Sequence, residues 1–246
     1  PAYREEEMPE IIRLCDHIIL NSPAQVKKYK DQILAGGKSP GLRINPRFST
    51  QEGHEIYDPC APGSRLGTAI DQITEELLDG IEGLHFHTLC EQNSDALSDT
   101  LKAVEEQFGP YMHRMKWINF GGGHHITRED YDRELLKKCI RYVQDTYGVQ
   151  VYLEPGEAVA LNAGILLEVM ENELSIAILD TSAACHMPDV LEMPYRPPLK
   201  DSGLPGEKAF TFRLGGPTCL AGDVIGDYSF DWKLKCGDIL EFGGKK

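Results

Sequence analysis

Short β-prone runs alternate with longer helical patterns from the start of the chain to about residue 156, and this alternation limits the possible folds more than any other feature. The β-prone runs are HIILNS, GLRINP, GLHFHT, WINFGGG and VQVYLEPG. Strands that take turns with helices usually pair in parallel, because the helix provides the crossover between neighbouring strands. We therefore expect an α/β fold in which a parallel sheet forms much of a (β/α) barrel.

The helical segments carry recognisable end signals. Ser22 and Pro23 are typical of the N-cap and first residue of a helix, here over SPAQVKKYKDQIL. Residues 64–80 and 94–109 also have helical patterns. Thr127 and Asp130 fit a capping box for a helix that runs to Gly148.

The helical signal fades from Ala158 onward. The segment AGILLEVMENELSIAILDTS predicts two strands around a turn at residues 171–173, and KAFTFRL, DVIGDYSF and GDILEF predict further strands. We therefore expect two domains: a partial (β/α) barrel over residues 1–158 and an all-β domain, a β-sandwich or barrel-like unit, over residues 159–246.

Composition restricts the classes of function. The 246 residues are 41% hydrophobic with a net charge of −14, which is too apolar for a disordered chain and too acidic for a general nucleic-acid binder. Seven scattered cysteines, an odd number without CxxC spacing, indicate a reducing compartment. No apolar run is long enough to span a bilayer, and the opening PAYREEEMPE lacks a basic signal-peptide region, so we expect a cytoplasmic protein that binds neither membrane nor nucleic acid.

The run LHFHT places two histidines on one face of a predicted strand. Side chains alternate along a strand, so His85 and His87 share one face while Leu84 and Phe86 share the other. A single histidine is most often structural. At the carboxyl end of a barrel strand, where active sites gather, a functional role becomes more favourable.

Three further motifs combine glycines with reactive side chains. NFGGGHH ends a strand with three glycines whose N–H groups suit an anion such as phosphate, or which simply make a tight turn. LEPGE places Glu154 at a strand end and Glu157 beyond it, where a solvated loop residue is the simpler interpretation. GGPTCLAGD carries Cys219 and Asp223 in a loop, although an isolated cysteine is usually a small buried apolar residue.

In this order along the chain, LHFHT, NFGGGHH, LEPGE and GGPTCLAGD resemble the alanine-racemase-fold, pyridoxal-phosphate-dependent decarboxylases, a family that includes ornithine, arginine and diaminopimelate decarboxylases. HFHTLCEQ, EPGEA and LDTSAACHMPDVLEMPYRP are most similar to the branch that acts on carboxylated polyamines. The resemblance covers nearly the whole chain. It implies a pyridoxal-phosphate-binding (β/α)8 TIM-type barrel, whose N-terminal part precedes residue 1, and a C-terminal β-domain that contributes to the active sites of a homodimer.

The resemblance also implies the cofactor site. His87 stacks on the ring of pyridoxal phosphate, Glu154 faces the pyridine nitrogen, and the phosphate is held by Gly121, Gly122 and Gly123. A carboxylate at that nitrogen keeps it protonated, and the protonated ring stabilises the carbanion left when carbon dioxide departs.

The remaining implied roles concern the acid and the substrate. Cys219 is the candidate proton donor to the carbanion, and with Asp223 it completes the site of the neighbouring subunit. The amines of a polyamine-type amino acid need acidic partners, for which Asp189 and Glu157 are the candidates with Asp180 behind them, and His85 lies on the substrate side or behind the cofactor site.

Several alternatives remain open. The family's cofactor-linking lysine lies on the first barrel strand, upstream of these residues, so we expect the chain as written not to supply it. Glu157 replaces an arginine that ornithine decarboxylase has after EPG, which favours the polyamine branch over plain ornithine decarboxylase, while ornithine, arginine and diaminopimelate stay open as alternative substrates. An inactive relative that binds partners is a second alternative. A metal site of His85, His87, His124 and His125 is a third, but a catalytic zinc needs about three ligands with fixed support, so we expect no metal.

Overall fold

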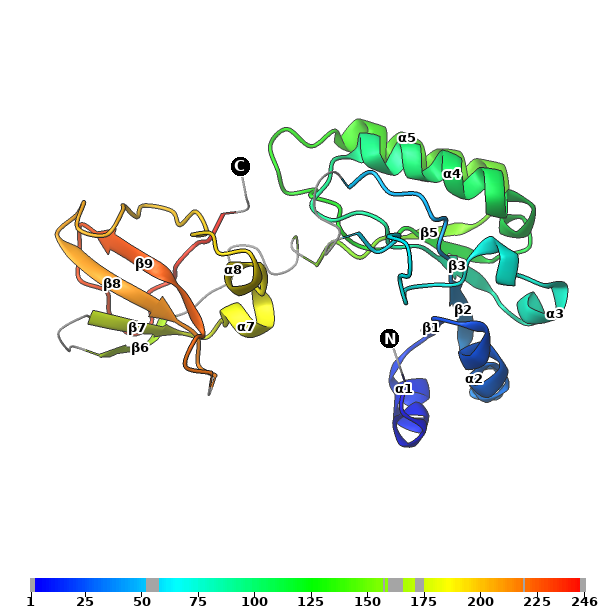
Figure 1. Cartoon of the computed structure of the whole chain (residues 1–246), viewed down its shortest axis with the longest axis horizontal. Helices are drawn as coiled ribbons and strands as arrows, with labels where there is room; N and C mark the ends of the chain where they lie inside the picture. Colours follow the sequence, from blue (N-terminus) through cyan, green and yellow to red (C-terminus); the bar gives the residue numbers. More distant parts are fainter. Residues whose placement is uncertain are drawn as a thin grey trace. The chain divides into compact units, whose positions relative to one another are not determined.

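The computed structural model describes residues 3–51, 58–156, 158, 166–170, 175–218 and 220–243. The chain divides into two compact units, Pro1–Ala158 and Val159–Lys246 (Figure 1). Each unit has its own cluster of buried apolar side chains.

The first unit is built on five parallel strands in the order β1-β2-β3-β4-β5. They are β1 (His17–Leu20), β2 (Ser39–Arg43), β3 (Gly83–His85), β4 (Trp117–Asn119) and β5 (Gln150–Tyr152). The main helices are α2 (Pro23–Ala35), α4 (Ser94–Met112) and α5 (Arg133–Tyr147), with shorter α1 (Met8–Leu14) and α3 (Glu75–Leu78) and 3-10 turns at Glu5–Glu7 and Ile70–Gln72. Helices α4 and α5 pack side by side (Figure 1).

The strand register places a row of apolar side chains on one face of the sheet. Leu20, Leu42, Leu84 and Ile118 pair across β1 to β4 in one row, and all four are buried. The next residues along the strands point the opposite way, because side chains alternate. The carboxyl ends of the parallel strands lie along one edge, where the polar residues that follow Leu42, Leu84 and Ile118 also lie.

The predicted α/β class and most helix ends in this unit are confirmed. The Ser22 hydroxyl accepts a hydrogen bond from the Gln25 N–H, and Pro23 begins α2. Gly148 ends α5 with a φ of 68°. The predicted capping box is wrong, because the Asp132 side chain is the one that caps α5, accepting from the Leu135 N–H.

The continuous helix predicted over residues 64–80 is also wrong. Gly67 has a φ of 86°, and an added Cβ there would lie 2.9 Å from the Ile44 backbone. The Asn21 and Asn45 side chains hold this segment, the first accepting from the Gly67 N–H and the second donating to the Leu66 carbonyl. These tertiary hydrogen bonds outweigh the helical pattern, and only the 3-10 turn and α3 form.

The second unit is one mixed sheet in the order β6-β7-β8-β9. Its strands are β6 (Leu166–Met170), β7 (Ser175–Leu179), β8 (Phe210–Gly215) and β9 (Val224–Phe230). The β6–β7 and β8–β9 pairs are antiparallel, whereas β7 and β8 are parallel, since the chain between them crosses over through α7 (Ala183–His186) and α8 (Asp189–Glu192).

Two expectations for the second unit need correction. It is not all-β, because Ser182 caps a helical turn by accepting from the Cys185 N–H. GDILEF forms no strand, and its Phe242 makes an isolated bridge to Leu199. The described strands form one mixed sheet, and a sandwich or barrel-like unit stays a prediction. The turn predicted at 171–173 lies outside the described residues.

A search of the described residues found no helix both long and apolar enough to cross a membrane.

Candidate active site

Polar side chains end three neighbouring strands at the carboxyl edge of the first sheet. Arg43 ends β2, His85 ends β3 and Asn119 ends β4, and the register pairs Arg43 with His85 and His85 with Asn119. Paired residues of parallel strands point to the same side of the sheet. The register therefore forms one row from a guanidinium, an imidazole and an amide.

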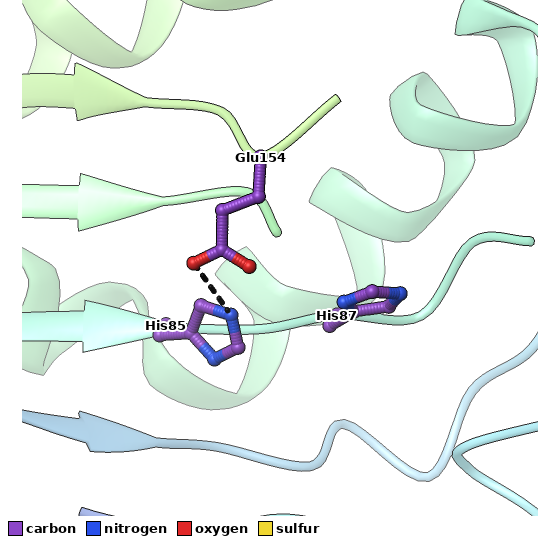
Figure 2. Close-up of side chains that lie close together, drawn as sticks. All are labelled: His85, His87 and Glu154. Atoms are coloured by element: carbon purple, nitrogen blue, oxygen red, sulfur yellow. Dashed lines mark ion pairs between the residues drawn. The ribbon is translucent and has the colours of Figure 1, made fainter. Parts of the chain in front are cut away.

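His85, His87 and Glu154 converge beside this row (Figure 2). Each offers a ligand atom, and these atoms all lie within 4.8 Å of one another. His87 lies just beyond the end of β3, with its ring 6.5 Å from the His85 ring between centroids. Glu154 lies two residues beyond β5. His85 and His87 belong to LHFHT and Glu154 to LEPGE, so two of the strand-end motifs meet at the same edge of the sheet.

The Glu154 carboxylate is contacted by His85 and Asn119 through one of its two oxygens, Oε1. His85 is 5% exposed, and its Nε2 lies 3.5 Å from Glu154 Oε1, the spacing of an ion pair more than of a hydrogen bond. The interaction with His85 is the main cause that lowers the pKa of Glu154 to about 2, and the Asn119 amide adds to it against the opposing effect of burial. Glu154 is therefore ionised at neutral pH. Its side chain is 44% exposed, so the carboxylate is accessible to a ligand.

His87 is oriented by two backbone groups. Its Nδ1 accepts from the Gly122 N–H at 3.3 Å, and a hydrogen bond to the Leu89 backbone engages the ring further. Burial lowers the pKa of His87, and the positive charge of Arg43 lowers it further. Arg43 donates from Nη2 to the His87 carbonyl oxygen at 3.4 Å. His87 therefore presents a neutral imidazole.

The three glycines after β4 allow backbones to approach very closely. An added Cβ would lie 2.5 Å from the Phe86 carbonyl oxygen at Gly121, 2.8 Å from that of Glu154 at Gly122, and 2.0 Å from that of Leu89 at Gly123. Gly121 and Gly123 also have φ values of 71° and 79°. The loop lies against the segments that follow β3 and β5, which explains why all three positions need glycine.

Asn119 joins this loop to Glu154, and the sequence analysis missed it. Its Nδ2 donates to Glu154 Oε1 at 2.8 Å, and its Oδ1 accepts from the Gly121 N–H at 2.8 Å. The Glu154 N–H in turn donates to the Gly121 carbonyl oxygen at 2.8 Å. Arg43 was missed too. The signal that both residues offered was a polar side chain at the end of a predicted strand.

The other predicted site residues belong to three groups. Glu157 and Cys219 lie outside the described residues. Asp189 begins α8 in the second unit. Asp223, also in the second unit, accepts from the Thr218 hydroxyl at 2.7 Å and from the Ala184 N–H at 3.3 Å. Burial raises the pKa of Asp223, but hydrogen bonds led by that of Thr218 outweigh this effect and lower it.

The four-histidine metal site does not assemble as one group. In the described ranges, the group of potential cation-binding side chains that converges contains His85 and His87 with Glu154, but neither His124 nor His125. His124 is buried, and burial lowers its pKa to about 4.

Known proteins resemble the chain over nearly its full length. A carboxynorspermidine/carboxyspermidine decarboxylase from Campylobacter jejuni is 46% identical over 98% of this chain and 66% of its own length. A carboxyaminopropylagmatine decarboxylase from Synechocystis is 40% identical over 98% of this chain and 64% of its own length. The crystal structure of carboxynorspermidine decarboxylase complexed with norspermidine from Campylobacter jejuni is 44% identical, with a TM-score of 0.69 over 98% of this chain and 66% of that one.

The chain thus spans slightly less than two thirds of the length of these relatives. The family described as pyridoxal-dependent decarboxylase, C-terminal sheet domain, matches residues 56–243, which take in β3, the glycine loop, Glu154 and nearly all of the second unit. This match covers more than half of the chain, and the chain belongs to the pyridoxal-dependent decarboxylase family.

Proposed function

We propose that the protein removes carbon dioxide from a carboxylated polyamine, carboxynorspermidine or carboxyspermidine, with pyridoxal phosphate as cofactor. The observation that carries the proposal is Glu154, an ionised carboxylate at the sheet edge beside a neutral His87. The 46% identity to a decarboxylase of these substrates supports the choice of substrate.

The residues at the sheet edge fit this cofactor. Glu154 is anionic and partly exposed, as a partner for a protonated pyridine nitrogen must be. The neutral imidazole of His87 suits contact with a flat aromatic ring. The N–H groups of Gly121 and Gly122 already donate to Asn119 Oδ1 and His87 Nδ1, so we assign the phosphate chiefly to the backbone of Gly123, with Gly121 and Gly122 shaping the loop.

Pyridoxal phosphate, when bound, supplies the electron sink that stabilises the carbanion formed by loss of carbon dioxide. Glu154 holds the proton at the ring nitrogen, and His87 orients the ring. Cys219 is our candidate for the acid that returns a proton to the substrate carbon. In this proposal Cys219 reaches the site of the partner subunit, so the homodimer is the active form.

Acidic side chains would bind the substrate's distal amines. Asp189 and Glu157 remain our candidates, and His85 acts behind Glu154 instead of on the substrate side, since its Nε2 faces Glu154 Oε1. Asp223 is a weaker candidate than the sequence alone suggests, because both of its carboxylate oxygens already accept hydrogen bonds within the second unit.

The test is carbon dioxide release by the full-length protein from a panel of substrates, with pyridoxal phosphate added. The panel is carboxynorspermidine, carboxyspermidine, carboxyaminopropylagmatine, diaminopimelate, ornithine and arginine. We expect the first two to have the highest kcat/KM, and Glu154→Gln to lower kcat on all of them. A preference for diaminopimelate, ornithine or arginine would refute the substrate. Failure of the wild-type protein to bind the cofactor would refute the reaction class.

A further inference from the structure

Three hydrogen bonds close a small cycle at the sheet edge, which we call the Asn119 triangle. It joins Asn119 to Glu154, Glu154 to Gly121, and Gly121 back to Asn119, and each donor–acceptor distance is 2.8 Å. Its members come from the ends of β4 and β5 and from the glycine loop. The triangle therefore fixes a side-chain carboxylate relative to a backbone loop across two strands.

The chemistry of the partners allows Asn119 only one orientation. The Gly121 N–H can only donate, so it requires the amide oxygen, whereas the ionised Glu154 carboxylate can only accept, so it requires the amide nitrogen. In the flipped orientation, Asn119 Nδ2 would face the Gly121 N–H, so two donors would meet. Asn119 Oδ1 would then face the Glu154 carboxylate, so two acceptors would meet. Asn119 is 8% exposed, so water cannot readily replace either contact.

Both side chains that hold Glu154 meet the same oxygen. Asn119 Nδ2 and His85 Nε2 lie 2.8 Å and 3.5 Å from Oε1. The second carboxylate oxygen points towards the side on which His87 lies (Figure 2). One oxygen is thus used for positioning, and the other faces the region that the cofactor ring would occupy.

From this geometry we infer that Asn119 is a positioning residue, which, with His85, holds Oε1 of Glu154 and sets the spacing between the glycine loop and Oε2. The inference rests on the proposed function for the meaning of that spacing, since the loop would receive the cofactor phosphate and Oε2 the ring nitrogen. Asn119 itself does not touch the cofactor. The Asn119 amide thus links the glycine loop, at the phosphate end of the proposed cofactor site, to Glu154 at the ring-nitrogen end.

A double-mutant cycle tests the triangle without any cofactor. Asn119→Asp keeps an oxygen that accepts from the Gly121 N–H, but it places a second carboxylate against that of Glu154. The melting temperature should therefore fall. In the double variant with Glu154→Gln, the glutamine amide at position 154 can donate to the aspartate carboxylate at position 119, which reverses the wild-type hydrogen bond. The double variant should therefore regain most of the melting temperature that Asn119→Asp loses. If the two substitutions lower it additively, the triangle is not a coupled unit and the inference is wrong.

Cofactor affinity tests the positioning role. We expect Asn119→Asp to weaken binding of pyridoxal phosphate about tenfold, the order expected for a partly exposed charge-assisted hydrogen bond. Binding of the analogue with CH in place of the ring nitrogen should change less than about threefold, since it cannot use Glu154. Asn93→Asp is the matched control, because it also replaces an amide that donates to an oxygen, here the Asp130 carbonyl at 3.0 Å, at a residue outside the Asn119 triangle.

The outcomes separate the two proposals. If the wild-type protein does not bind pyridoxal phosphate, the proposed function fails, while the thermal cycle still decides the triangle. If the wild type binds it and Asn119→Asp weakens both ligands equally, or neither, Asn119 does not position Glu154 and the inference is overturned.

Discussion

Replacing Glu154 with glutamine should cost stability at neutral pH but not in acid. Glutamine keeps an oxygen that accepts from Asn119, so the substitution removes mainly the negative charge beside His85. The pKa of Glu154 is lowered from an ordinary 4.5 to about 2 in the folded protein. A lowered pKa means that the fold favours the ionised form, so the contribution is fully present above about pH 4.5 and is lost as the pH falls towards about 2.

The magnitude follows from the same two values. Full conversion of this pKa difference gives an upper bound of about 3 kcal/mol. Because the Glu154 side chain is 44% exposed, solvent screening reduces our expectation to about 1 kcal/mol. Urea unfolding of both proteins between pH 7 and pH 3 measures the difference, with Glu106→Gln on the exposed side of α4 as control. A difference that is absent at pH 7, or that grows towards acid, would refute the charge argument.

Three other predictions concern the glycine loop, the substrate and the dimer. Gly123→Ala should lower the free energy of unfolding by at least about 2 kcal/mol in chemical denaturation. Gly148→Ala, at a residue with a similar positive φ but nothing within 4 Å of its added Cβ, should lower it by only about 1 kcal/mol. Equal losses would contradict the close approach of Gly123 to Leu89. Asp189→Asn should raise KM for carboxynorspermidine and spare a short substrate that lacks the distal amine, and an equal loss on both substrates would mean that Asp189 has no role in amine binding. Mixing inactive Cys219→Ala and Glu154→Gln proteins should restore up to about a quarter of wild-type activity, since about half the dimers are hybrids with one intact site; no recovery after demonstrated subunit exchange would exclude a shared site.

The strand and helix order could be predicted because it depends on local patterns. Alternation of β-prone runs with capped helices predicted the five parallel strands of the first unit. The family resemblance implied that His87 and Glu154 share one site, and His85, His87 and Glu154 do converge where β3 and β5 end.

Features that depend on long-range contacts could not be predicted. The Asn21 and Asn45 side chains replace the predicted helix after residue 64 with turns, and nothing near Gly67 in sequence reveals them. Asn119 was missed for the same reason, since its partner Glu154 lies 35 residues away. The crossover that makes β7 and β8 parallel also depends on pairing that strand propensity does not specify.

The protonation state of the bound cofactor tests the central claim most directly. Pyridoxal phosphate labelled with ¹⁵N at the ring nitrogen can be bound to the wild-type and Glu154→Gln proteins, and its chemical shift read by NMR at neutral pH. We predict a protonated ring nitrogen in the wild type and an unprotonated one in the variant. An unprotonated nitrogen in the wild type, or the same protonated shift in both proteins, would contradict the role of Glu154 on which the proposed decarboxylation depends.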